Sequence, residues 1–105
     1  MNEPEAFKLL TLASARDNRT VDQAIAKVWA TDLARIDYNL AVEALTLHYS
    51  ETTDWLLPAH VIRCANRITT KRRLEEQHRL SIAERTRKAE EAERTRLIMQ
   101  GVLQP

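Results

Sequence analysis

The chain has 105 residues, a formal net charge of +1, one glycine and one cysteine. The glycine, Gly101, lies near the C-terminus, so we exclude glycine-built phosphate loops, whose backbones need glycine to approach a nucleotide. A single cysteine, Cys64, excludes an intramolecular disulfide and a tetracysteine metal site. No apolar run approaches the ~20 residues of a membrane span. Glu3 and Glu5 are unlike the basic start of a signal peptide, so we expect a cytoplasmic protein.

The charge is divided unevenly along the chain. Residues 1–57 carry five Lys/Arg and nine Asp/Glu, whereas residues 58–105 carry eleven and six. The first part is therefore acidic and the second basic, and such asymmetry is a hint of function. We predict an all-α protein in which a four-helix head domain, residues 1–70, continues into a charged helical extension, residues 71–105.

The first two predicted helices begin at capping signals. Asn2 and Glu5 form a capping-box pattern with Pro4 in the first turn. Thr20 and Gln23 form a second such pattern. The apolar stripes behind these caps have helical spacing. In the first helix Phe7, Leu10 and Ser14 share a face beside Ala6, Leu9 and Ala13; in the second, Val21, Ala24, Ile25, Val28 and Trp29 recur and continue to Leu33 and Ile36.

Asp37 is the predicted N-cap of the third helix, and Pro58 the first-turn residue of the fourth. No segment alternates with the period of a strand. The third helix has the apolar stripe Leu40, Ala41, Ala44, Leu45 and His48, and the fourth is expected to face the core with Val61, Ile62, Ala65 and Ile68.

Beyond Ile68 the apolar residues are spread around the helix and sustain no heptad, which argues against a strong coiled coil. The extension is rich in helix formers and carries Glu–Arg and Glu–Lys pairs at i,i+4, for example Glu75–Arg79 and Glu84–Lys88. Each such pair contributes ~0.2–0.5 kcal/mol to a helix. We therefore predict a marginally stable helix there.

Catalytic and metal-binding signals are weak. His60 and Cys64 at i,i+4 could supply half of a zinc site, but four ligands are needed and no second pair has ligand spacing. A core-facing cysteine beside a partly exposed histidine is the favoured interpretation. No serine has the strand–turn–helix context of an activated nucleophile. We expect a protein that is not an enzyme and has no cofactor and no metal.

The candidate partner-binding residues are one tryptophan and a group of cations. Trp29 belongs to a clean stripe and is expected in the core, whereas Trp55 is either a lid on the core or an exposed contact residue. The net charge over residues 71–96 is about +3, and six glutamates interleave with the cations, which disfavours nucleic acid. No aromatic residue there could stack on a base. The predicted contact residues are Trp55, Arg72, Arg73, Arg79, Arg85, Arg87 and Lys88.

Taken in chain order, the apolar stripes of the head resemble those of the phage-encoded loaders and inhibitors of the replicative DNA helicase. The matching features, over roughly residues 5–68, are Phe7–Leu10, Trp29, Glu43-Ala44-Leu45 with His48-Tyr49, and Leu57-Pro58-Ala59-His60-Val61-Ile62-Arg63. The resemblance implies a helical head and a C-terminal part that binds the hexameric helicase in its nucleotide-bound form. It also implies inhibition of the helicase, its delivery to an origin-binding initiator in the host bacterial cytoplasm, and no ATP hydrolysis by the loader itself.

Two alternatives stay open. A small DNA-binding regulator predicts binding that weakens steeply with salt. A helix-pairing structural or assembly module predicts self-association through the extension without helicase or DNA. The favoured interpretation is an adaptor with weak or no direct DNA binding and no membrane contact.

Overall fold

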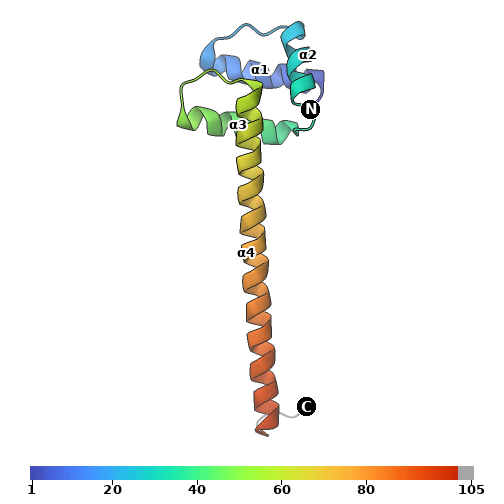
Figure 1. Ribbon diagram of the computed structural model, residues 1–105, viewed down its shortest axis with the longest axis vertical. Coiled ribbons are helices and arrows are strands. Elements are labelled where there is room, and N and C mark those ends of the chain that lie inside the picture. Colours follow the sequence, from blue (N-terminus) through green and yellow to red (C-terminus); the bar gives the residue numbers. More distant parts are fainter. Residues whose placement is uncertain (102–105) are drawn as a thin grey trace. The chain divides into compact units, whose positions relative to one another are not determined.

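The computed structural model describes residues 1–101, and within them the chain is all-α, as predicted. The helices are α1 (Glu3–Asp17), α2 (Gln23–Asp32), α3 (Tyr38–Glu51) and α4 (Pro58–Met99) (Figure 1). The chain divides into two compact units, the first Met1–Thr69 and the second beginning at Thr70. From here on "the head" is Met1–Thr69 and "the tail helix" is the part of α4 from Thr70 to Met99.

The caps of α1 and α3 are those that the sequence predicts. The Glu5 amide donates to Asn2 Oδ1 (2.9 Å) and the Asn2 amide donates to Glu5 Oε1 (3.0 Å), which completes the capping box. Asn18 ends α1 in the left-handed region (φ 57°), which asparagine tolerates better than most residues. At α3 the Asp37 carboxylate accepts the amide of Asn39 at 3.0 Å.

The predicted start and end of the second helix are wrong. Asp22, not Thr20, is the N-cap of α2, and its Oδ1 accepts the Ile25 amide at 2.8 Å. Asp22 can cap because its side chain lies three residues before that amide, while the chain before it remains outside the helix. The helix ends at Asp32, and the Ile36 amide then donates to the Leu33 carbonyl in a turn (3.0 Å).

The start of α4 is held by a histidine. The Leu57 amide donates to His60 Nδ1 at 2.9 Å, so His60 does at the third helical position what glutamate or glutamine does in a capping box. The nitrogen must be unprotonated to accept this bond. Pro58 follows Leu57 in the first turn, as predicted.

The head has one apolar core to which all four helices contribute. In α4 the buried face is Val61, Cys64 and Ala65, so Ile62, about 100° away around the helix, is 38% exposed instead of inward-facing. Trp29 is buried, as expected. The buried apolar residues are Ala6, Leu9, Leu10, Ala13, Ala26, Trp29, Leu33, Ala41, Ala44, Leu45, Leu56, Val61, Cys64 and Ala65.

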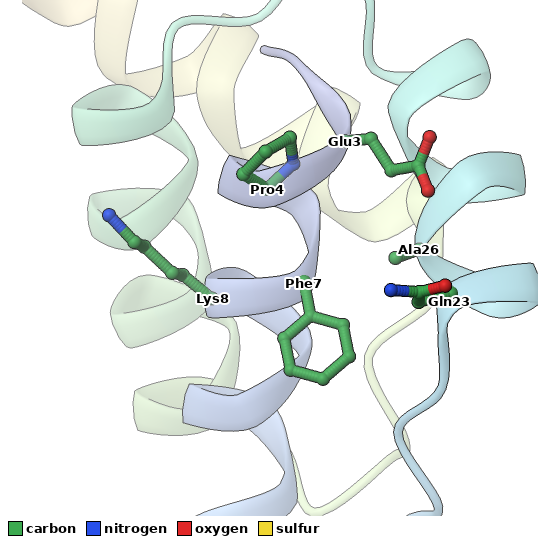
Figure 2. Close-up of a pocket in the computed structure, with 6 residues that line it drawn as sticks. All are labelled: Glu3, Pro4, Phe7, Lys8, Gln23 and Ala26. Atoms are coloured by element: carbon green, nitrogen blue, oxygen red, sulfur yellow. The ribbon is translucent and has the colours of Figure 1, made fainter.

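Phe7 also departs from its predicted place. It is 39% exposed, because the buried face of α1 consists of Ala6, Leu9, Leu10 and Ala13. Its ring lines an open pocket between α1 and α2 (Figure 2). The other residues that line this pocket are Glu3, Pro4, Lys8, Gln23 and Ala26.

We predict that residues 1–70 fold without the remainder of the chain. The caps and the core described above all lie within the head, so truncation after Thr70 removes no buried side chain from it. The truncated protein should unfold in one cooperative transition, followed by circular dichroism on heating. A non-cooperative melt of residues 1–70, beside a cooperative melt of the full chain, would contradict this prediction.

Candidate partner-binding surfaces

Trp55 is an exposed aromatic residue in the loop between α3 and α4. Its side chain is 56% exposed, while its neighbour Leu56 is fully buried. The Arg19 guanidinium carbon lies 5.1 Å from the centre of the Trp55 ring and 5.3 Å from that of Trp29. Both distances are within the range of a cation–π interaction. Trp55 therefore rests on Arg19 while much of its surface remains available to a partner.

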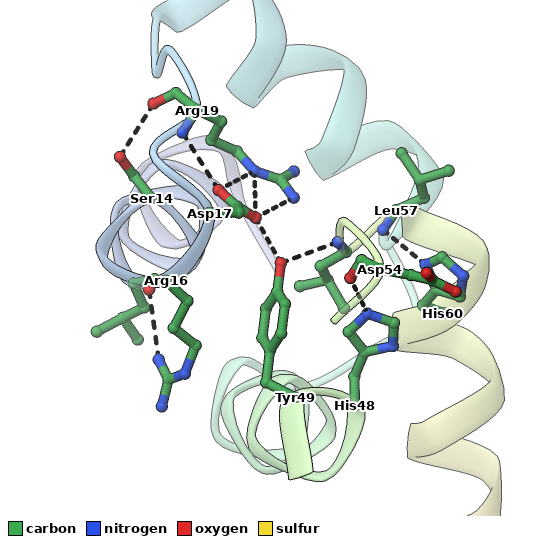
Figure 3. Close-up of polar contacts among 11 residues, drawn as sticks. Ser14, Arg16, Asp17, Arg19, His48, Tyr49, Asp54, Leu57 and His60 are labelled. Carbon is green, nitrogen blue, oxygen red and sulfur yellow. Dashed lines mark hydrogen bonds and ion pairs between the residues drawn. The ribbon is translucent and has the colours of Figure 1, made fainter. Parts of the chain in front are cut away.

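Arg19 is held by a buried polar network at the end of α1 (Figure 3). Its Nε donates a hydrogen bond to the Asp17 carboxylate (2.9 Å), and the same carboxylate accepts a hydrogen bond from the Tyr49 hydroxyl. The Tyr49 oxygen in turn accepts a hydrogen bond from the Leu56 amide at 3.0 Å. The side chains of Arg19 and Asp17 are only 7% and 3% exposed. The network thus joins the loop after α1, helix α3 and the loop that carries Trp55.

The protonation equilibria of the network reflect this arrangement. Burial by itself raises the pKa of Asp17, but the hydrogen bonds from Arg19 and Tyr49 and the charge of Arg19 outweigh it, so the pKa is lowered. Burial raises the pKa of Tyr49, and its bond to Asp17 raises it further. Asp17 is therefore a carboxylate that is stabilised by its partners, and it has no features of a proton donor in catalysis.

A shallow pocket opens beside Trp55. Its lining combines the Trp55 ring with hydroxyl, amide and guanidinium donors. The Arg16 guanidinium carbon lies 5.9 Å from the centre of the Tyr49 ring. Such a mixture suits contact with a protein partner better than it suits a buried small molecule. The lining residues are Arg16, Asp17, Asn18, Tyr49, Thr52, Thr53 and Trp55.

Two histidine rings lie close together, tilted by 33°, near the start of α4. The rings of His48 and His60 have centroids 4.4 Å apart, and His48 Nε2 lies 2.6 Å from the Asp54 carbonyl oxygen, to which it can donate. Within residues 1–101 no group of three or more His, Cys, Asp or Glu side chains could hold a metal ion. Cys64 is buried, as the favoured interpretation expected, and His60 is partly exposed.

The six predicted contact residues of the tail helix are all exposed. From Thr70 to Arg96 every side chain is exposed, including Leu74 at 56% and Leu80 at 57%. Arg79 pairs with Glu76, three residues before it, and not with the predicted Glu75, whereas the predicted pair of Glu84 and Lys88 is present at 3.7 Å. The predicted cations that lie here are Arg72, Arg73, Arg79, Arg85, Arg87 and Lys88.

Sequence reasoning missed Asp17, Arg19 and Tyr49. Asp17 and Arg19 sit in a polar segment that is typical of a loop, and no local pattern shows that a tyrosine 32 residues away reaches Asp17. The one available signal was local spacing, because an Asp and an Arg two residues apart at the end of a helix can form an ion pair.

In comparisons with known proteins, no family model, curated protein or solved structure matches this chain. None of the helices in residues 1–101 is both long enough and apolar enough to cross a membrane.

Proposed function

We propose that the protein is a non-enzymatic adaptor whose tail helix binds a protein partner, and that this partner is a replicative hexameric DNA helicase. One observation supports partner binding above all: from Thr70 to Arg96 the helix has no buried side chain. Helices in proteins owe most of their stability to tertiary packing. A long helix without packing of its own is therefore well suited to packing on another molecule.

The class of partner follows from the side chains and from the resemblance. Leu80, Ala83, Leu97 and Ile98 lie within about a third of the circumference of the helix, among long arginine side chains on the same side. Arginine is enriched in protein interfaces. The order of stripes in the head resembles phage helicase loaders, which inhibit the helicase and deliver it to an origin-binding initiator. On this proposal Trp55, exposed on the head, supplies a second contact.

Charge reversal in the tail helix tests this function. Changing Arg72, Arg73 and Arg79 together to Glu should abolish binding to the purified helicase hexamer with a bound ATP analogue. The melting temperature of the head should stay the same, because these side chains are exposed and lie outside the head. Binding can be measured by size-exclusion chromatography and by the loss of helicase ATPase inhibition.

The matched control changes the same three residues to Lys, which preserves the charge and should keep binding within about tenfold of the original, a difference of ~1.4 kcal/mol. Truncation after Thr70 should behave like the Glu variant. A truncated protein that still binds and inhibits the helicase would refute the proposed role of the tail helix.

A further inference from the structure

The glutamates of the tail helix are confined to one side of it. Successive residues of an α-helix are about 100° apart around its axis. On a helical wheel drawn with this angle, all six glutamates between Lys71 and Arg96 fall within about half of the circumference. The other half, here called the acid-free face, contains Thr70, Lys71, Leu74, Gln77, His78, Ser81, Ile82, Arg85, Lys88, Ala89, Ala92, Thr95, Arg96 and Met99.

The two sides differ in charge and in how their cations are paired. The acid-free face carries four Lys/Arg and no acid, whereas the opposite, mixed face carries five Arg and the six Glu. On the mixed face Arg79 donates to Glu76 (3.1 Å) and Arg87 donates to Glu84 (2.8 Å). The mixed face is therefore close to neutral, and its ion pairs are at hydrogen-bond distance.

The cations of the acid-free face are held more loosely. Lys71 and Lys88 reach glutamates at the border of the face only at 4.0 and 3.7 Å, and Arg96 does so at 3.7 Å. Arg85 forms no ion pair with any residue between Met1 and Gly101. Their charges are thus available to an external anion.

We propose that the acid-free face binds the phosphate backbone of duplex DNA. Besides its cations the face presents Thr70, Gln77, Ser81 and Thr95, whose side chains donate hydrogen bonds to phosphates in protein–DNA complexes. Phosphate oxygens accept hydrogen bonds, and the face has no carboxylate to repel them. Lys71 and Arg96 are about 38 Å apart along the axis, which is close to one turn of B-DNA at ~34 Å.

Two other occupants fit the face less well. A single strand is bound by stacking its bases on aromatic rings, and the tail helix has no Phe, Tyr or Trp. A protein interface is centred on aromatic and other large apolar anchors, and the acid-free face has only Leu74, Ile82 and Met99, far apart along the helix. The proposal goes beyond the helicase contact and does not depend on it.

The test compares two variants of equal net charge in the full-length protein. One changes Arg85, Lys88 and Arg96 to Gln on the acid-free face, and the other changes Arg79, Arg87 and Arg94 to Gln on the mixed face. Binding of each variant to a fluorescent 20-base-pair duplex is measured by anisotropy titration between 50 and 200 mM salt. Circular dichroism shows whether helix content is retained. A 20-nucleotide single strand is measured in parallel.

The unmodified protein should bind with a dissociation constant of ~10⁻⁶–10⁻⁴ M at physiological salt, and log K should fall against log salt with a slope of about −3 to −4. The acid-free-face variant should reduce the slope to about −1 and weaken binding at 50 mM salt by more than ~100-fold. The mixed-face variant should keep the slope and lose less than ~10-fold.

Equal losses in the two variants would overturn the proposal, since they would show only a general effect of net charge. Absence of binding by the unmodified protein at 50 mM salt would overturn it too, as would tighter binding to the single strand. If the acid-free-face variant loses the helicase and keeps the duplex, the face serves an acidic protein surface and the DNA proposal is wrong.

Discussion

Replacing Arg19 with Met should destabilise the head by about 3–5 kcal/mol, the usual cost of leaving one charge of a buried pair without its partner. The Asp17 carboxylate, 3% exposed, would keep the hydrogen bond from Tyr49 but lose the positive charge beside it. Two cation–π contacts, to Trp29 and Trp55, would be lost as well. Small domains have a total stability of ~5–15 kcal/mol, so urea unfolding should be measured at low temperature.

The matched control is Arg67→Met, which removes an ion pair with Glu51 at 2.6 Å whose side chains are 54% and 48% exposed. This change should cost much less than Arg19→Met, because water screens the pair in the native state. Adding Asp17→Asn to Arg19→Met should cost less than the sum of the single changes. Similar small losses for Arg19→Met and Arg67→Met would show that the Asp17–Arg19 pair is not buried in solution.

The stability of the head should fall as the pH drops below about 6.5, because of His60. Burial lowers the pKa of His60, and repulsion from His48 and Arg63 lowers it further, against the opposing effect of Asp54. The unfolded chain, with an ordinary histidine pKa of about 6.5, then binds a proton more readily than the folded one. The stabilising contribution is present above pH ~6.5 and is lost as the pH falls toward the lower folded value.

A glutamine in place of His60 separates this effect from other titrations. Gln is a usual residue at the third position of a capping box, so His60→Gln should keep an acceptor for the Leu57 amide and remove the proton. The melting temperature of the variant should therefore depend less on pH between 7.5 and 5 than that of the unmodified protein. Parallel pH profiles for the two would contradict the assignment to His60.

Asp17 contributes in a different pH range. Its folded pKa is below the ordinary 3.8, so the stability that it provides is present above about pH 4 and is lost as the pH falls through the lowered value. This loss begins at a lower pH than the loss of the His60 contribution, which begins near pH 6.5. The melting temperature should accordingly begin to decline near pH 6.5 and decline further below about pH 4.

The parts of the fold that the sequence predicted well are those determined by neighbouring residues. Asn2, Asp37 and Pro58 mark helix starts because each acts within one turn of its own position. The start of α2 was harder, since Thr20 and Asp22 are both acceptable caps and only the packed structure decides between them. Phe7 and Ile62 were misplaced because an apolar stripe is wider than the face that becomes buried.

The surroundings of Trp55 could not be predicted from the sequence. They depend on Arg19, which is 36 positions away and is brought near only when the loop after α1 meets the loop before α4. In the tail helix the order of charges along the sequence does not by itself show how they are arranged around the helix axis. Interleaved charges in a sequence can be segregated around a helix, because each step of one residue turns the side chain by about 100°.

The exposure of every side chain between Thr70 and Arg96 also affects the heat capacity of unfolding. The heat-capacity increment of unfolding is set mainly by apolar surface that becomes hydrated, and these residues are already hydrated in the folded chain. At ~12–15 cal/mol/K per residue, the head of residues 1–69 accounts for about 0.8–1.0 kcal/mol/K. The tail helix adds little to that increment, so the stability curve of the 105-residue chain has the broad, shallow dome of a much smaller protein.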